Sequence, residues 1–584
     1  MARANPRKLL AQAKQALAQG RTDHAFLLLR EAYAAAPKDA GAARLLADVL
    51  LALGRPMEAV EGLADHLAVN PRSADAARSL SDIFAAVTPV SFATVDAAGL
   101  TAALRLDRVA ADPLGRAAGL LLAERGEASA FRRGSGEFAL LLALLEAAPV
   151  REPALESWLV ARRRAVLLGP AEVREAQELL DEPLLAAMAR QVWLNEGVWP
   201  ADGEERKAVD TLDPADPGQV PLAALYLPPE RWCPDDAGAA ALPKDFAGLV
   251  GDIRRERHEM ARADAALGPA IGAADATGGA VAAQYEANPY PRWGWVQPTP
   301  RGAGRAFLER IAGQFEATSP AAPSGGWAKG PLRIAVAGCG TGQEAVQAAL
   351  AYAPNARLLA FDFSRASLRY AAMKARQHGL NAIHFRQADI LDLPAFDPPF
   401  DRPADLIECV GVLHHMADPF AGWRILLERL RPGGLMYVGL YSATARRGLT
   451  ALRERIARER LVGEGIDPAD PDAIRRVRAR ILARPENAFE RSLAASADFY
   501  TLSNARDLLF HAHERPLTLD AIGGFLADEG LELLHMDVRP HIADAFAAAQ
   551  GGSAMLDLRA WAAFERDNPD TFDGMYLFWV RKSG

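Results

Sequence analysis

Cysteine is scarce in this chain of 584 residues. The three cysteines, Cys233, Cys339 and Cys409, are odd in number and lie far apart, so neither a disulfide framework nor a CxxC metal pair can be drawn. This usage favours a reducing compartment. We therefore expect a cytoplasmic protein without a bound metal.

Long apolar runs are also missing. No stretch approaches the roughly 18 uninterrupted apolar residues that a membrane-spanning helix needs. The N-terminal stretch MARANPRKLLAQAKQALAQG is basic, but it has the pattern of an amphipathic helix and lacks the apolar core of a signal peptide. We expect a chain that is neither exported nor inserted in a membrane.

A surplus of basic charge is absent as well. The formal net charge is −8, which argues against a polyanion as the default partner, and we expect no nucleic-acid partner. Half of the residues are hydrophobic and 24% are charged, the profile of a soluble globular protein.

The length of the chain and the changes of pattern along it predict several domains. We expect a multidomain α and α/β protein whose parts follow one another in this order: helical repeats over 1–90, an α-helical domain over 91–200, a proline-rich connector and helix over 201–280, and an α/β domain over 281–584 with an insertion at about 443–525.

An internal repeat occupies the N-terminal part. Four residues recur 34 positions later: Gly20 as Gly54, Ala25 as Ala59, Pro37 as Pro71, and Ala40 as Ala74. This is the period of tetratricopeptide (TPR) repeats, and the two stretches resemble such repeats. A solenoid usually needs about three repeats, so further helices or a neighbouring domain must complete the core. The repeats either form a groove for a protein partner or serve only as a packing module.

Beyond residue 330 helices alternate with apolar strands. Strands are expected at 332–338, 356–362, 382–389, 404–411, 434–442, 531–538 and 574–582. This alternation predicts a doubly wound, seven-stranded, Rossmann-like sheet with parallel strands. Ligands bind such sheets beyond the carboxyl ends of the strands, where the first glycine-rich turn lies.

That turn reads IAVAGCGTGQEA over 334–345 and contains Gly338, Gly340 and Gly342. No lysine follows, which excludes a P-loop for nucleoside triphosphates. The dinucleotide fingerprint GxGxxG would need glycine at position 343, where this chain has Gln343. The spacing GxGxG resembles the cofactor loop of class I S-adenosylmethionine (SAM)-dependent methyltransferases.

The resemblance extends over roughly 330–442 and the two last strands, and it implies a methyltransferase with SAM as its cofactor. It implies that Asp362, at the end of the second strand, binds the ribose hydroxyls and that Asp389, after the third strand, faces the adenine amino group. The expected cofactor site consists of Gly338, Gly340, Gly342, Asp362, Phe363, Asp389, Ile390, Val410 and Tyr285.

A second short motif, DPPF at 397–400, looks like the [DNS]PP[YF] sequence of methyltransferases that modify planar nitrogens. In those enzymes the motif ends the fourth strand, whereas here it precedes that strand. We interpret it as a turn, which removes the main argument for methylation of an exocyclic amine or of glutamine.

Catalysis requires little beyond alignment of the nucleophile and exclusion of water, because SAM carries an activated methyl group. A base assists when the acceptor is a hydroxyl, an amine or an acidic carbon. His414 and His415, at the exit of the fourth strand, are candidates for that role, and Tyr290 is a further catalytic candidate. Alternatively, one of the histidines only forms a hydrogen bond to the backbone.

Two further segments bear on the site. QYEANPYPRWGW at 284–295 precedes the first strand; we expect Tyr285 or Tyr290 to contact SAM and Arg292 to face the acceptor, unless the segment is an aromatic plug against the helical domain. The insertion is arginine-rich in its first half. It predicts either a lid for an anionic acceptor or a solvated helix face with Glu–Arg pairs.

Two hypotheses about function follow. In the first, an active methyltransferase uses the repeats to dock a protein or other macromolecular acceptor, although a small molecule, lipid or glycan also fits. In the second, the chain is an interaction scaffold whose domain binds SAM without turnover. The intact glycine loop, Asp362 and Asp389 favour the first hypothesis.

Overall fold

The computed structural model describes residues 5–87, 91–125, 131, 133–169, 182–233, 244–268, 276–296, 303–316, 331–352, 355–393, 402–459 and 470–583. The DPPF motif at 397–400 lies outside the described residues. The chain divides into two compact units. Unit 1 comprises Met1–Arg254, Gly294–Gln297 and Asp470–Ala505, and unit 2 comprises Arg255–Trp293, Pro298–Ala469 and Arg506–Gly584.

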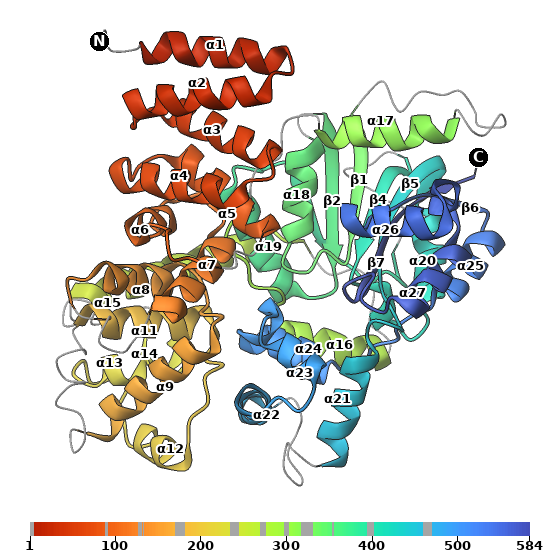
Figure 1. Cartoon of the computed structure of the whole chain (residues 1–584). Helices are drawn as coiled ribbons and strands as arrows, with labels where there is room; N and C mark the ends of the chain where they lie inside the picture. Colours follow the sequence, from red (N-terminus) through yellow and green to blue (C-terminus); the bar gives the residue numbers. More distant parts are fainter. Residues whose placement is uncertain are drawn as a thin grey trace. The chain divides into compact units, whose positions relative to one another are not determined.

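Unit 1 is helical and begins as a stack of antiparallel helices (Figure 1). The stack consists of α1 (Pro6–Ala18), α2 (Thr22–Ala35), α3 (Ala40–Ala52), α4 (Pro56–Val69), α5 (Ala74–Ala86), α6 (Ala97–Leu104), α7 (Ala111–Arg125), α8 (Gly136–Ala147), α9 (Pro153–Leu168) and α11 (Glu182–Leu194). From α3 to α9 each helix packs on the next but one along the chain. The solenoid therefore continues well beyond the part with a visible 34-residue period, and these later helices complete its core.

The recurring residues of the repeat occupy equivalent places. Gly20 and Gly54 follow α1 and α3 with φ angles of 71° and 70°, a left-handed conformation that favours glycine. Ala25 and Ala59 are buried in α2 and α4, where a larger side chain would separate the helices.

Part of the insertion packs inside unit 1. Helices α22 (Pro471–Ala483) and α23 (Ala488–Leu493) belong to this unit, and the fully buried Arg478 of α22 forms a bidentate ion pair with Glu156 of α9. The two nitrogen–oxygen distances are 2.7 and 2.6 Å. Arg478 therefore stabilises the core of unit 1 and is neither part of a solvated helix face nor a free cation.

Unit 2 contains a seven-stranded sheet with the order β3-β2-β1-β4-β5-β7-β6 (Figure 1). Its strands are β1 (Leu332–Ala337), β2 (Ala356–Asp362), β3 (Ile383–Gln387), β4 (Ala404–Val410), β5 (Leu430–Tyr441), β6 (Leu531–Met536) and β7 (Met575–Lys582). The predicted doubly wound, Rossmann-like sheet is confirmed, with one difference. β7 runs antiparallel to β5 and β6, because the connection after β6 returns to the carboxyl edge of the sheet before β7 begins.

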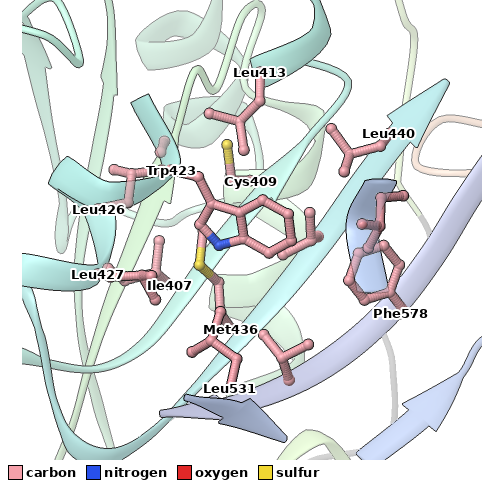
Figure 2. Close-up of a cluster of buried hydrophobic side chains, with 14 of the residues drawn as sticks. Ile407, Cys409, Leu413, Trp423, Leu426, Leu427, Met436, Leu440, Leu531 and Phe578 are labelled. Carbon is pink, nitrogen blue, oxygen red and sulfur yellow. The ribbon is translucent and has the colours of Figure 1, made fainter. Parts of the chain in front are cut away.

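Helices cover both faces of the sheet, and each face has its own core. On one face lie α17 (Ala303–Glu316), α18 (Gln343–Tyr352) and α19 (Arg365–Gln377); on the other lie α20 (Pro419–Glu428), α25 (Leu519–Asp528), α26 (Pro540–Gln550) and α27 (Leu558–Asp567). Figure 2 shows the second core, where the buried Trp423 lies among Cys409, Leu413, Met436 and Phe578. Among the described helices, none is both long and apolar enough to span a bilayer.

The turn from β1 to α18 depends on its three glycines. All three have positive φ angles, which side chains other than glycine rarely adopt. A Cβ atom on Gly338 would lie 2.4 Å from a methyl group of Val412, and one on Gly342 would lie 2.5 Å from the Cβ of Ala371 in α19. A Cβ on Gly340 would lie 3.1 Å from the carbonyl oxygen of Tyr290. The glycines thus allow three other segments of the chain to approach the turn.

We predict that Gly342→Ala destabilises unit 2 more than Gly379→Ala. Both positions are left-handed, with φ of 83° and 73°, but a Cβ on Gly379 would meet nothing within 4 Å. Backbone strain alone costs about 1–2 kcal/mol, and overpacking against Ala371 adds about 1–3 kcal/mol. Urea denaturation monitored by circular dichroism measures both changes in the free energy of unfolding. Equal losses for the two variants would show that the contact with Ala371 is unimportant.

Candidate active site

A cavity of about 280 Å³ opens at the carboxyl edge of the sheet in unit 2. Most of the residues predicted from the sequence line it: Gly338, Gly340, Asp362, Phe363, Asp389, Ile390, Val410, Tyr285, Tyr290 and His415. Gly342 and His414 do not line it. The described residues contain no group of three or more His, Cys, Asp or Glu side chains arranged to hold a metal ion.

Asp362 connects the ends of β1 and β2. Its two carboxylate oxygens accept hydrogen bonds from the backbone N–H groups of Gly340 and Ser364, at 2.9 and 2.8 Å. Burial raises the pKa of Asp362 to about 6, although both hydrogen bonds oppose that shift. A carboxylate has about four lone-pair sites, so Asp362 can accept two further hydrogen bonds from a ligand in the cavity.

Asp389 lies after β3 and, with the two residues that follow it, forms one side of the cavity. One of its carboxylate oxygens accepts a hydrogen bond from the backbone N–H of Leu391 at 2.9 Å. The side chains of Ile390, Leu391 and Phe363 line the same cavity. A carboxylate beside apolar side chains suits a flat, weakly polar group that carries a hydrogen-bond donor at its edge.

The aromatic segment before β1 closes another side of the cavity. The Tyr285 hydroxyl donates a hydrogen bond to Asp507 at 2.8 Å, and the indole N–H of Trp293 donates to the carbonyl oxygen of Thr341 in the glycine loop at 3.1 Å. Arg292 does not line the cavity, because it forms an ion pair with Glu256 at 2.9 Å. The part of the segment up to Trp293 therefore packs on the glycine loop within unit 2.

His415 is the histidine that reaches the cavity. Its Nδ1 lies 3.0 Å from the carbonyl oxygen of His513 and must donate that hydrogen bond, because a carbonyl can only accept. The proton of the neutral ring is thus on Nδ1, and Nε2 carries a lone pair. Burial lowers the pKa of His415 to about 3, with Arg446 and Arg453 contributing to the shift. The imidazole is neutral throughout the physiological pH range.

His414 has a different environment. Its ring is fully buried and stacks on Tyr441, with ring centroids 3.7 Å apart, and its Nδ1 accepts a hydrogen bond from the backbone N–H of Tyr441 at 3.2 Å. Burial lowers the pKa of His414 well below its usual value. Since the ring lies outside the cavity, its role in the described structure is to pack the exit of β4 against β5.

A chain of hydrogen bonds holds a third histidine beside His415. His511 Nδ1 accepts from the backbone N–H of His513 at 3.0 Å, so its proton is on Nε2, which lies 3.1 Å from the Tyr285 hydroxyl. Tyr285 in turn donates to Asp507. The rings of His511 and His415 stack with centroids 3.9 Å apart. His511 therefore fixes the plane of the His415 ring.

Two arginines lie behind this histidine pair. Arg446 and Arg453 of the insertion share one buried carboxylate, Glu514, at 3.0 Å each. The guanidinium of Arg446 also lies 3.3 Å from the ring centroid of Tyr441, which lines the cavity. Asp507 is a second buried acid beside the pair, with Oδ1 3.7 Å from His511 Nε2, and both arginines lower the pKa of His415 and His511.

Several residues of the site could not be identified from the sequence. Tyr441, His511, Asp507 and Met575 have no motif and lie far along the chain from the glycine loop. Glu344 lies within the IAVAGCGTGQEA turn and also lines the cavity. Its acidic character, two residues after the last glycine, is the signal that could have identified it.

Comparisons with known proteins match two parts of the chain. Residues 334–461 match the family model described as a methyltransferase domain, and residues 16–83 match a tetratricopeptide-repeat family model. Among curated proteins, the chain is 31% identical over 191 residues to an uncharacterized protein of Synechococcus sp.. That match covers 30% of this chain and 40% of the relative, so the chain spans well under half of the relative's length.

Two solved structures are among the matches. PKMT2 from Rickettsia typhi in complex with AdoHcy is 15% identical, with a TM-score of 0.32, over 43% of this chain and 49% of that chain. Phosphoethanolamine N-methyltransferase 2 from Haemonchus contortus, in complex with S-adenosyl-L-methionine, is 13% identical, with a TM-score of 0.25, over 48% and 52% of the two chains. The family models confirm the two parts expected from the sequence: this chain carries a methyltransferase domain and an N-terminal tetratricopeptide-repeat region.

Proposed function

We propose that unit 2 binds SAM in this cavity and catalyses methyl transfer to a macromolecular acceptor in the cytoplasm, and that the repeats of unit 1 dock this acceptor. The observation that carries the proposal is one cavity that combines the glycine loop, Asp362, Asp389 and an unprotonated His415 Nε2. SAM supplies a methyl group that is already activated on a sulfonium. The residues of the chain therefore bind, orient and exclude water.

The cofactor roles follow from the unused hydrogen-bonding capacity of two carboxylates. Asp362 retains lone pairs for the two ribose hydroxyls while it holds the Gly340 and Ser364 N–H groups. Asp389, beside Ile390 and Phe363, suits the amino group of a stacked adenine. Tyr285 and Tyr290 close one side of the cavity. The Tyr285 hydroxyl already donates a hydrogen bond to Asp507, so we propose that this residue contacts SAM through its ring rather than through its hydroxyl.

His415 is the proposed base. Its Nε2 is unprotonated at neutral pH, and no described residue forms a hydrogen bond to it. The low pKa makes this nitrogen a weak base, so it accepts a proton only as the acceptor becomes acidic during methyl transfer. His414 stays a structural residue in this proposal, because its Nδ1 already accepts from the Tyr441 backbone.

The repeats offer apolar surface for an acceptor. Leu27 in α2, Leu51 in α3 and Val69 at the end of α4 are 54%, 39% and 48% exposed. They make up half of the large hydrophobic side chains that are exposed among the described residues. What supports the docking role is the match of this region to a repeat family, and these three side chains are the contacts we propose for a protein acceptor.

The acceptor can be identified by labelling. Protein is incubated with SAM carrying a radiolabelled methyl group and with lysate of a strain that lacks the gene, and the products are separated into protein, nucleic acid, lipid and glycan fractions. Label in the protein fraction supports the proposal. SAM binding without label in any fraction supports an interaction scaffold.

We predict that Asp362→Asn weakens SAM binding by roughly ten- to a hundredfold, because ribose hydroxyls lose a charged acceptor. In the unaltered protein, one step in the loss of affinity should occur as the pH decreases through about 6, the pKa of Asp362, since protonation removes the carboxylate that accepts these bonds, and this step should be absent from Asp362→Asn. Calorimetric titrations from pH 5 to pH 8 measure both effects. Asp389→Asn should lower affinity yet keep this pH dependence; an unchanged affinity in Asp362→Asn refutes the ribose role.

We predict that His415→Phe lowers kcat by about 10²–10⁴-fold and leaves SAM affinity nearly unchanged, because the ring still stacks on His511 while the accepting nitrogen is lost. His414→Phe is the matched variant, since its ring stacks on Tyr441 outside the cavity. It should lower thermal stability and retain most of the activity. Initial rates of label transfer measure kcat. Full activity of His415→Phe would show that no base is required at this position.

We predict that the double variant Leu27→Glu/Leu51→Glu binds SAM normally but labels the protein fraction about tenfold more slowly, because two partly exposed leucines contribute about 1–2 kcal/mol on burial. Leu556→Glu, at a side chain that is 50% exposed in unit 2, is the control. Circular dichroism verifies folding in each case. Unaltered labelling by the double variant would contradict docking through this surface.

A further inference from the structure

Glu344 is an acidic side chain in the cavity wall without a cationic partner. It lies in the first turn of α18, two residues after Gly342, and it lines the cavity together with Gly338 and Val410. In the part of the chain that the structure describes, Glu344 forms no ion pair and accepts no hydrogen bond. A carboxylate with such surroundings is unfavourable unless it is protonated or a ligand compensates it.

A buried acid, Glu408, lies behind the partly exposed Glu344. Glu408 on β4 is paired in register with Val336 on β1, two residues before Gly338, and it is 8% exposed. The hydroxyl of Tyr352, at the end of α18, donates a hydrogen bond to Glu408. The charge of Glu408 is not neutralised by this bond, because a phenol contributes a donor and no positive charge.

The other titratable groups that act on Glu344 do not neutralise it. They are Glu408 of β4, Cys409 of β4, Cys339 of the glycine loop and Tyr437 of β5, and none of them is a cation. Burial and the charge of Glu408 raise the pKa of Glu344 to about 8. Burial raises the pKa of Glu408 to about 7. The pair therefore carries about one proton near neutral pH.

We propose that Glu344, with Glu408 behind it, recognises the positive charge of the methionine part of SAM, and that SAM binding expels a proton from this acidic pair. The inference rests on the proposed function, because it requires SAM in the cavity. SAM has two positive groups, an ammonium and a sulfonium, and one negative group, its own carboxylate, so its net charge is positive. Both cationic centres lie in the methionine part, whereas Asp362 and Asp389 are assigned to the nucleoside part.

The acidic pair also distinguishes substrate from product. Methyl transfer converts the sulfonium into a neutral thioether, so S-adenosylhomocysteine has one positive charge fewer than SAM. Without the sulfonium charge, the ionised Glu344–Glu408 pair is less well neutralised. It therefore regains a proton and binds the product less tightly. Glu344 is therefore a specificity-determining residue that favours SAM over its product and promotes product release.

Calorimetric titration of the full-length protein tests the proposal without an acceptor. SAM and S-adenosylhomocysteine are each titrated at pH 7.5 in phosphate and in Tris, whose ionisation enthalpies differ, so that the difference in heat gives the number of protons released. We expect SAM to release between about 0.5 and 1 proton, because that is the proton content of the pair at this pH. We expect S-adenosylhomocysteine to release fewer protons and to bind about tenfold more weakly, the loss typical of one charged contact.

Glu344→Gln keeps the size of the side chain and removes its charge. This variant should release fewer protons with SAM and bind SAM and S-adenosylhomocysteine with nearly equal affinity. Asp389→Asn is the control, and it should weaken both ligands while the proton release and the preference for SAM persist. If Glu344→Gln does not fold, proton release by the unaltered protein still tests the proposal.

Two results overturn the inference. One is SAM binding to the unaltered protein without proton release; the other is a preference for SAM that persists in Glu344→Gln. Failure of the proposed function has a different signature, because the unaltered protein would then not bind SAM at all.

Discussion

The hydrogen bonds from Gly340 and Ser364 to Asp362 are the contacts on which the candidate site depends. They join the turn after β1 to the turn after β2 and thereby fix the glycine loop at the carboxyl edge of the sheet. The loop can take this position only because its glycines adopt positive φ angles and leave room for Val412, Tyr290 and Ala371. One buried carboxylate thus organises the floor of the cavity and keeps lone pairs for a ligand.

A second set of contacts determines which ring nitrogens of His415 and His511 carry protons. The segment His511–His513 supplies a backbone N–H to His511 and a backbone carbonyl to His415. The two rings consequently have opposite tautomers and stack on each other. Burial and the charges of Arg446 and Arg453 disfavour protonation of either ring. The two arginines thus keep the histidine side of the cavity neutral in its rings, and Glu344 and Glu408 make another part of the surroundings acidic.

The roles of the arginines in the insertion could not be inferred from their clustering in the sequence. The sequence allowed a lid over an anionic acceptor or a solvated face of Glu–Arg pairs. In the structure, Arg478 is buried against Glu156 in unit 1, while Arg446 and Arg453 pair with Glu514 in unit 2. Their partners lie far along the chain, so no local pattern could have indicated them. The domain boundaries inferred from composition likewise stay a prediction.

The sequence by itself determined the architecture of the methyltransferase domain and the start of the helical repeats. Alternating apolar strands and helices, the GxGxG turn and the 34-residue offsets are local patterns, and local patterns are set by backbone sterics and by which face of an element is buried. They located all seven strands to within a few residues and brought Asp362, Asp389 and His415 to one cavity. Only the tertiary structure decided that His415 rather than His414 lines this cavity, that Arg292 pairs with Glu256, and that Glu344 and Glu408 lie together with no cation paired to them among the described residues. Each of these outcomes depends on which distant side chains pack around a group, and that packing sets its burial, its hydrogen-bond partners and its charge.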